Sequence, residues 1–345
     1  MQEVFRFNGI DIRAGQRRTV DLAIARLYTH TDMKMPVHVV HGKKTGPRLF
    51  VSGAIHGDEI NGPEIIRRLL KLKLLSRLRG TLIAIPIINI YGYVNHSRYL
   101  PDRRDLNRSF PGSEKGSLGS HLARLFLDQI AAHCTHGIDL HSGSNHRNNL
   151  PQVRTSLDDP ETAAMARAFG APVIIDSRLR DGSLREAVRE MGIPMLLYEG
   201  GEALRFNEVA IHMGMRGIVA VMRRIGMLPK REEHRPEVEP LIATRTTWVR
   251  APISGILPWR INVGARVRKG DRVAVIADPF GELEEPVYAP VSGIVIGVLN
   301  LPMAHRGDAL FNIASLSEKA DVEATLEALD IFLTPEGGIN IEDVP

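Results

Sequence analysis

The sequence predicts an α/β protein with a mixed sheet flanked by helices, followed by a small C-terminal β-sandwich or barrel domain. Three observations support this prediction. Short apolar runs alternate with longer helical patterns between residues 48 and 228, residues 229–240 are polar and rich in proline, and a short motif then occurs twice. The length of 345 residues also fits two units, because a single hydrophobic core stops growing at about 250 to 300 residues.

The predicted strands of the first unit are short apolar segments, most of which contain β-branched residues. They cover residues 49–55, 82–90, 137–140, 172–175 and 194–198. The patterns between them have helical spacing. This alternation favours a parallel or mixed sheet with helices packed on it.

Residues typical of helix ends mark three helices in the first unit. Pro63 suits the first turn of one helix. Ser183 and Glu186 have the spacing of a capping box at the start of a second helix. Asn207 is a candidate N-cap for a third helix, which we expect to run to Gly226.

The proline-rich segment at residues 229–240 is the best linker candidate in the chain. We therefore predict an α/β domain over residues 1–235, a β domain over residues 241–316 and a C-terminal tail over residues 317–345.

An internal repeat characterises the predicted β domain. Ala-Pro-Ile-Ser-Gly-Ile at residues 251–256 recurs as Ala-Pro-Val-Ser-Gly-Ile at residues 289–294. Two similar β units predict a nearly symmetric sandwich or barrel that resembles the lipoyl or biotinyl carrier fold. Residues 281–285 lack the lysine that a carrier needs between its halves. This absence favours a structural or substrate-shielding module.

Composition and charge exclude several classes of function. The 44 basic and 40 acidic residues leave a formal charge of only +4, without a long basic run, so we expect no nucleic-acid partner. One cysteine, Cys134, cannot form an intramolecular disulfide. Without a secretory signal or a long apolar span, the protein is expected to be cytoplasmic and to have no membrane partner. The oligomeric state stays open, and a homo-oligomer is compatible with the sequence.

The first candidate metal ligands are His56 and Glu59, in a glycine-rich segment after a predicted strand. Histidine and glutamate three residues apart, joined by a second histidine, can form a catalytic zinc site. The same His-x-x-acid spacing also occurs at His136, His234 and His305, so spacing alone is weak evidence. Position favours His56 and Glu59, because open α/β sheets bind ligands at the carboxyl ends of their strands.

His141 is the best candidate for the third ligand, because it ends the predicted strand at residues 137–140. Asp139 could orient its imidazole as an outer carboxylate. His133 and His136 are alternatives, although one ends a helical pattern and the other precedes the strand.

Glu199 is the candidate general base, because it follows the apolar strand at residues 194–198 directly. A carboxylate at this edge could take a proton from water and pass it to a leaving amine. Glu202 is the alternative base. The shape of the pocket is expected to depend on a loop over residues 145–153.

Arginines after the second predicted strand suit an anionic substrate. Arg108 with Asn107 could bind a carboxylate through a guanidinium fork and an amide donor. Arg98 could polarise the scissile carbonyl and hold an oxyanion. Arg103 and Arg104 are alternatives for that role.

In combination these motifs resemble the succinylglutamate desuccinylase/aspartoacylase family of zinc hydrolases, which has the zinc carboxypeptidase fold. The resemblance rests on Gly-Ala-Ile-His56-Gly-Asp-Glu59, Asp105-Leu-Asn107-Arg108, Asp139-Leu-His141-Ser-Gly and Glu199-Gly. It covers roughly residues 45 to 228 and extends to the trailing β domain.

The resemblance implies a role for each candidate residue. One zinc ion per chain would be held by His56, Glu59 and His141, with Glu199 as the general base. Other side chains would contact the substrate, namely Asn107 and Arg108 as the carboxylate clamp, Arg98 at the carbonyl, and Arg185 as a second substrate-binding arginine.

The expected activity is hydrolysis of an amide bond that releases the acyl group from a small N-acyl amino acid. A metallocarboxypeptidase that cleaves a peptide end would use the same residues, because a carboxylate clamp serves both substrates. A non-catalytic binding protein is the alternative from another class. Zinc content separates that class from the two hydrolases.

Overall fold

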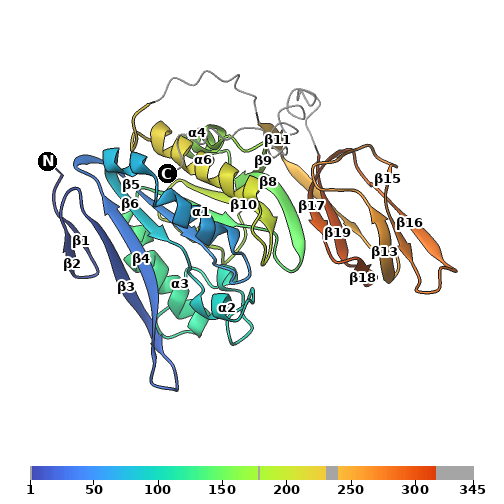
Figure 1. Ribbon diagram of the computed structural model, residues 1–345, viewed down its shortest axis with the longest axis horizontal. Helices are drawn as coiled ribbons and strands as arrows, with labels where there is room; N and C mark the ends of the chain where they lie inside the picture. Colours follow the sequence, from blue (N-terminus) through green and yellow to red (C-terminus); the bar gives the residue numbers. More distant parts are fainter. Residues whose placement is uncertain (1, 178, 231–239, 316–345) are drawn as a thin grey trace.

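The computed structural model describes residues 2–177, 179–230 and 240–315 (Figure 1). Most of the predicted linker, residues 231–239, and the predicted tail at residues 317–345 lie outside the described residues. Among the described residues, no helix is long and apolar enough to cross a membrane.

One large mixed sheet organises the molecule (Figure 1). Its four neighbouring central strands are parallel, and antiparallel strands extend it on both sides. In spatial order the strands are β12 (Arg245–Arg250), β19 (Ala309–Ser315), β17 (Gly293–Leu299), β8 (Arg147–Thr155), β10 (Met195–Glu202), β7 (His136–His141), β5 (Lys44–Gly53), β6 (Arg79–Ile85), β4 (Asp32–His41) and β3 (Arg17–Arg26). Short strands β9 (Val173–Asp176), β11 (Leu241–Ala243) and β14 (Arg266–Val267) join it at its sides.

The five strands predicted in the first unit are confirmed as β5, β6, β7, β9 and β10. The second prediction extended too far, because β6 ends at Ile85. Pro86 follows it, and the side chain of Asn89 accepts a hydrogen bond from the Gly92 amide at the start of helix α2 (Ile90–Val94). The apolar sequence continues beyond Ile85, but a proline and a helix cap end the strand there.

The segment expected as a loop at residues 145–153 is largely strand β8, so that prediction was wrong. Its polar sequence and Pro151 argued against a strand inside a sheet. Residues 147–149 pair with β17, whereas residues 152–155 pair with β9. Pro151 lies between these two pairings. Proline has no backbone N–H, and at this position the backbone does not have to donate a hydrogen bond to a neighbouring strand.

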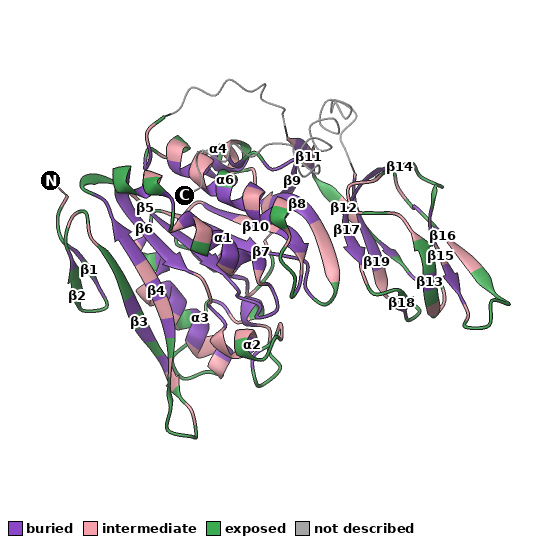
Figure 2. Cartoon of the chain, in the orientation of Figure 1, coloured by how far each residue is buried: buried purple, intermediate pink, exposed green. Residues whose placement is uncertain are grey.

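Helices cover both faces of the sheet (Figures 1 and 2). Buried side chains of α1 (Asn61–Leu69), α4 (Pro160–Phe169) and α6 (Glu208–Arg224) form one core with Leu49 and Val51 of β5. On the other face, Phe50 packs with α3 (Leu118–Gln129) and α5 (Leu184–Glu190), and with the hairpin of β1 (Phe5–Phe7) and β2 (Ile10–Ile12). The period-two alternation along β5 therefore divides its side chains between two cores.

The predicted helix ends are confirmed. Ser183 accepts a hydrogen bond from the Glu186 amide, and the Glu186 carboxylate accepts one from the Gly182 amide at 2.8 Å. Asn207 caps α6 in the same way by accepting from the Ala210 amide. These caps satisfy amide groups that have no partner within the helix.

The C-terminal β domain has two packed layers. A sheet of β16 (Glu284–Tyr288), β15 (Arg272–Ala277), β13 (Gly255–Arg260) and β18 (Met303–Ala304) faces β12, β19 and β17 across a core of valine, alanine, leucine, isoleucine and Phe311. Because β17 also pairs with β8, this domain is hydrogen-bonded directly to the α/β sheet. The domain boundaries stay a prediction.

The predicted symmetry of the β domain is visible in its hydrogen bonds. Ala251 donates to Asp308 O at 2.9 Å and accepts from the Gly307 amide at 2.8 Å. Its repeat counterpart Ala289 makes the same pair of bonds with Asp271 and Gly270, at 2.9 Å each. The two alanines thus occupy equivalent positions, each directly after a strand, β12 or β16.

Candidate active site

The candidate site lies at the carboxyl ends of the parallel strands. His56 follows β5 by three residues, and His141 is the last residue of β7. Glu199 on β10 is the register partner of His141, so their side chains leave the same face of the sheet. Strand order therefore assembles residues that are far apart in the sequence, as the sequence analysis expected.

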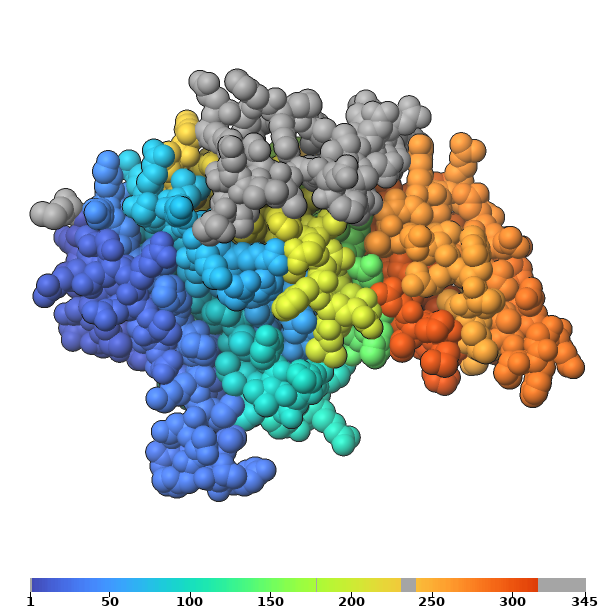
Figure 3. Space-filling view, in the orientation of Figure 1, coloured from blue at the N-terminus to red at the C-terminus, as the bar shows by residue number. Residues whose placement is uncertain are grey.

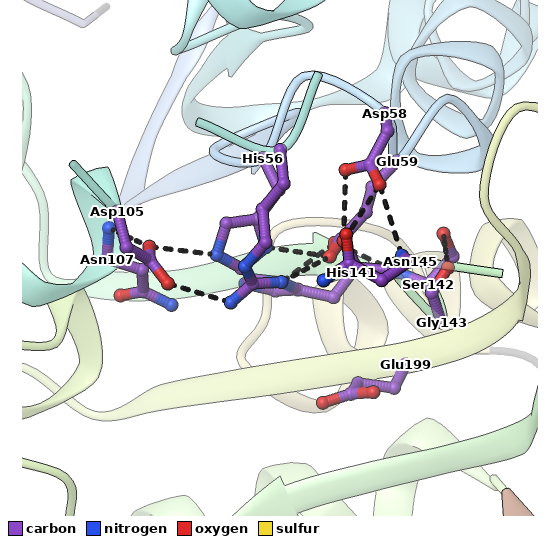
Figure 4. A network of polar contacts seen from close by, with 12 residues as sticks. His56, Asp58, Glu59, Asp105, Asn107, His141, Ser142, Gly143, Asn145 and Glu199 are labelled. Atoms are coloured by element: carbon purple, nitrogen blue, oxygen red, sulfur yellow. Dashed lines mark hydrogen bonds and ion pairs between the residues drawn. The ribbon is translucent and has the colours of Figure 1, made fainter. Parts of the chain in front are cut away.

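His56, Glu59 and His141 form a compact buried group that could hold a metal ion (Figure 4). One potential ligand atom from each residue lies within 4.8 Å of the other two. Glu59 bridges the histidines, with Oε1 at 2.7 Å from His56 Nδ1 and Oε2 at 2.9 Å from His141 Nδ1. Both imidazoles thus turn Nδ1 toward the shared carboxylate.

Two outer carboxylates hold these imidazoles by their other nitrogen. Asp105 Oδ1 lies 3.2 Å from His56 Nε2, and Asp139 Oδ2 lies 2.8 Å from His141 Nε2. The Ser52 hydroxyl donates to Asp139 Oδ1 at 2.7 Å. Such outer partners fix the orientation of a metal-binding imidazole and raise its basicity.

The electrostatics of the group suit a cation. Burial opposes the charged form of Glu59, but both imidazoles outweigh it and hold the pKa of its carboxyl far below the ordinary value. Burial likewise disfavours a charged His141, but Asp139 and Glu59 raise its pKa well above the ordinary value. Three carboxylates, from Glu59, Asp105 and Asp139, thus contact the two imidazoles, and such a cluster of negative charge favours a bound cation. The donor set of two imidazoles and a carboxylate fits zinc.

Arg98 is the arginine that the structure brings to this group. Its Nη2 donates to Asp105 Oδ2 at 2.8 Å, and its Nη1 lies 3.5 Å from Glu59 Oε1. The alternatives lie elsewhere: Arg103 is exposed, and Arg104 pairs with Asp102 at 3.5 Å. Of the three candidate arginines, Arg98 therefore lies beside the candidate metal-binding group.

The alternative histidines also lie outside the group. His133 packs edge-on against the rings of Phe5 and Phe7. His136, at the start of β7, lies 3.8 Å from Glu161. Neither histidine therefore belongs to the group of His56, Glu59 and His141.

Close backbone packing holds the loop that carries His56 and Glu59. A Cβ atom at Gly57 would lie 1.9 Å from the carbonyl carbon of Gly92. The left-handed residue of this loop is Ala54, with φ of 47°, and neither Gly53 nor Gly57 has a positive φ. Glycine is thus required at position 57 because the backbone of Gly92 lies too close for a side chain, and not because of its backbone dihedral angles.

Replacing Gly57 by alanine is expected to destabilise the protein by about 1 to 3 kcal/mol, as overpacking typically does. Because the clash displaces the loop, the zinc content should also fall. Thermal unfolding and metal analysis check both effects. Gly9→Ala is the control for the zinc content alone: alanine is strained at the φ of 74° there, but its methyl group meets no atom within 4 Å and should leave the zinc content unchanged. Full zinc content in Gly57→Ala would contradict this account of the loop.

Glu199 contacts two residues of β8 that the sequence analysis did not identify. The Asn149 amide donates to Glu199 Oε2, and Arg154 Nε lies 3.3 Å from Glu199 Oε1. The strand β10 continues to Glu202, so Glu199 lies inside the strand and not beyond its end. These contacts were missed because β8 itself was expected as a loop.

The predicted clamp residues lie against the start of α5. Asn107 Oδ1 accepts from the Leu184 amide at 2.9 Å, which leaves its Nδ2 as the donor for a ligand. Arg108 donates to the Asn107 carbonyl. Arg185 is buried and donates to Ser177 Oγ at 3.0 Å. Burial first, and then the charges of nearby arginines, lower the pKa of Arg185 to about 10.

A cavity of about 750 Å³ adjoins the group beside Arg98 and Asp58. It extends past Glu202 to Asn300 and Leu301 of the β domain. Figure 3 shows the yellow surface of the α/β domain next to the red-orange surface of the β domain. The alternative base Glu202 therefore lines the wall of this cavity.

The mixed sheet, its two helical layers and its strand-end site define a protein of the zinc carboxypeptidase-like α/β fold class. The family model of the succinylglutamate desuccinylase/aspartoacylase catalytic domain matches residues 45–225. The chain belongs to this family, which confirms the resemblance read from the sequence motifs.

Relatives of this chain include a curated enzyme and solved structures. The N-alpha-acetyl-L-2,4-diaminobutyric acid deacetylase of Halomonas elongata is 26% identical over 296 residues, which is 82% of this chain and 86% of the relative. A succinylglutamate desuccinylase/aspartoacylase from Rhodobacter sphaeroides has a TM-score of 0.79 at 25% identity, covering 88% of this chain and 97% of its own. The product-bound ectoine utilization protein EutE (DoeB) from Ruegeria pomeroyi has a TM-score of 0.78 at 25% identity, covering 89% and 97%.

Proposed function

We propose that this protein is a zinc-dependent amide hydrolase that removes the acyl group from a small N-acyl amino acid. The observation that carries the proposal is the buried His56–Glu59–His141 group with its two outer carboxylates. The family and the deacetylase relative support amide hydrolysis of this kind. A non-catalytic binding protein would not need three candidate metal ligands together with two carboxylates that orient them.

His56, Glu59 and His141 would hold the zinc ion. When bound, such an ion acts as a Lewis acid on a carbonyl and makes water more acidic. Asp105 and Asp139 keep the imidazoles oriented through their Nε2 atoms. Because these five side chains are held by hydrogen bonds, the site is preorganised.

Glu199 is the group that moves the proton. Its carboxylate takes a proton from the attacking water and donates it to the departing amine nitrogen. Asn149 and Arg154 hold this carboxylate through one oxygen each.

Arg98 stabilises negative charge that develops on the carbonyl oxygen. Its guanidinium is anchored by Asp105 and lies close to Glu59, so it reaches the group in a fixed orientation. A preorganised donor of this kind contributes to catalysis because it costs no rearrangement during the reaction.

Chelation tests the proposal. The purified protein should release free amino acid from N-acyl amino acids, lose this activity with a zinc chelator and regain it when zinc is added back. Activity that persists in protein shown by metal analysis to be free of metal would contradict zinc dependence.

Replacing Arg108 by alanine should mainly raise KM, by about 10-fold to 100-fold, because a charge-assisted hydrogen bond to a substrate carboxylate is lost. Steady-state kinetics on the best substrate measure the effect. Arg124→Ala is the control, because Arg124 pairs with Asp128 on an outer helix at 2.6 Å. An unchanged KM in Arg108→Ala would remove Arg108 from the clamp.

A further inference from the structure

The β domain joins the sheet close to Glu199 (Figure 1). Strand β8 pairs on one side with β10, which carries Glu199, and on the other side with β17 of the β domain. Asn149 of β8 is the register partner of Gly297 of β17. Directly opposite residues of an antiparallel pair extend from the same face of the sheet. Gly297 therefore lies on the face from which Asn149 reaches Glu199.

The two polar atoms of the Asn149 amide lie toward different strands. The nitrogen donates a hydrogen bond to Glu199 Oε2. The oxygen lies toward β17, because a Cβ atom at Gly297 would be 3.0 Å from Asn149 Oδ1. One short side chain thus connects the candidate general base with the β domain.

The property that glycine provides at position 297 is space. Its φ lies outside the left-handed region, so the backbone there is open to any residue. Apart from Gly293, the other residues of β17 are isoleucine, valine and leucine, which favour strands. A Cβ atom at 3.0 Å from Asn149 Oδ1 would be closer than ordinary van der Waals contact. A side chain at position 297 would therefore press on the Asn149 amide.

Asn312 of β19 occupies the opposite side of Gly297. It is the register partner of Gly297 in the other direction, and it is only 3% exposed. Its Cβ would lie 3.5 Å from a Cβ atom at Gly297. A side chain at position 297 would thus lie between this buried residue and Asn149, which is half-buried. The Asn149 amide is the group with room to move.

Displacement of Asn149 would release one oxygen of the candidate base. Glu199 Oε1 lies 3.3 Å from Arg154 Nε, and Oε2 accepts from Asn149. Two contacts on different oxygens fix the plane of the carboxylate. Without Asn149 the carboxylate can rotate and pair with the guanidinium through both oxygens, which is a favoured geometry for arginine and a carboxylate. Neither oxygen would then be free to take a proton from the attacking water.

We propose that Gly297 is a positioning residue of the β domain, which acts through Asn149 to hold Glu199 in the orientation for proton transfer. The inference rests on the proposed function, in which Glu199 moves the proton. It gives the β domain a role in catalysis beyond that of a structural or substrate-shielding module. The β domain contributes this role by the absence of a side chain at one position of β17.

Replacements of Gly297 test the proposal. Since a misplacement of about 1 Å can cost about 100-fold in rate, kcat should fall by about threefold to tenfold in Gly297→Ala and by about 10-fold to 100-fold in Gly297→Val. Asn149→Ala should lower kcat about as much as Gly297→Val. In all three variants KM should stay within about twofold and the zinc content near one ion per chain, because the carboxylate clamp and the metal-binding group are not altered.

Coupling between the two residues separates positioning from a loss of stability. In the double variant Asn149→Ala/Gly297→Val the amide is already absent, so kcat should be no lower than in Asn149→Ala alone. Val295→Ala is the matched control, because Val295 lies on the same strand and is fully buried in the core of the β domain. It should lower the temperature of thermal unfolding and leave kcat within about twofold.

Unchanged kcat in folded Gly297→Ala and Gly297→Val, or losses that multiply in the double variant, would overturn the positioning role while leaving amide hydrolysis intact. A loss of kcat in Val295→Ala as large as in Gly297→Val would also overturn it, because the loss would then follow the stability of the β domain. Circular dichroism shows which variants fold, and Gly297→Ala decides alone if Gly297→Val does not. Hydrolysis of no N-acyl amino acid by the unmodified zinc-loaded protein would instead overturn the proposed function itself.

Discussion

Replacing Glu199 by glutamine is expected to lower kcat by about 10²-fold to 10⁴-fold, the usual contribution of a general acid-base group. The amide has nearly the same shape as the carboxylate but cannot accept the proton from water. Because Glu199 is not a member of the metal-binding group, the zinc content should stay at about one ion per chain. Steady-state kinetics and metal analysis of the same preparation measure both quantities.

Glu202→Gln is the matched control for this variant. Glu202 lies on the same strand but lines the cavity beyond Arg98. Its replacement should leave kcat within several-fold of the unmodified protein. A large loss of kcat in Glu202→Gln with normal turnover in Glu199→Gln would assign the base to Glu202.

Replacing His141 by alanine should abolish zinc binding and activity together. The loss removes one of three ligands and leaves Asp139 buried, at 1% exposure, without its imidazole partner. Zinc content measured by elemental mass spectrometry should fall from about one ion per chain to near zero at protein concentrations that saturate the unmodified site.

His136→Ala provides the comparison, since this histidine starts the same strand but lies near Glu161, away from the group. It should retain full zinc content. Far-ultraviolet circular dichroism of both variants shows whether the fold survives. Normal zinc content in folded His141→Ala would remove His141 from the metal site.

The grouping of His56, Glu59 and His141 could be predicted from sequence because all three residues lie at or just after the end of an apolar strand. His141 is directly at the end of β7, and His56 with Glu59 follows β5 on a short loop. The carboxyl ends of parallel strands in an open α/β sheet lie at one edge, so residues that follow different strands come close together. The symmetry of the β domain was also predictable from sequence. The two copies of the repeated motif form similar turns, and these turns make the same backbone hydrogen bonds.

The surroundings of Glu199 could not be predicted in the same way. Arg154, Gln152 and Asn149 lie on β8, whose polar sequence and Pro151 are unlike those of an interior strand. The strand forms because it pairs with different neighbours on either side of Pro151. Long-range pairing of this kind overrides local propensity and leaves little trace in the sequence.

Asp105 was quoted as part of a motif but received no role from the sequence. In the structure it contacts both His56 and Arg98. The distance along the chain from His56 to this carboxylate is 49 residues, so no local pattern joins them. Its function as an outer partner follows only from the fold.

Hydrolysis of a mixed panel by the zinc-loaded protein tests the central claim most directly. The panel contains N-acyl amino acids and short peptides with free C-termini, and mass spectrometry identifies the products beside a Glu199→Gln control. The account predicts cleavage of acyl amino acids, with release of the acyl acid and the free amino acid, and no such cleavage by Glu199→Gln. Cleavage of peptide C-termini in place of acyl amino acids would contradict it and identify a carboxypeptidase.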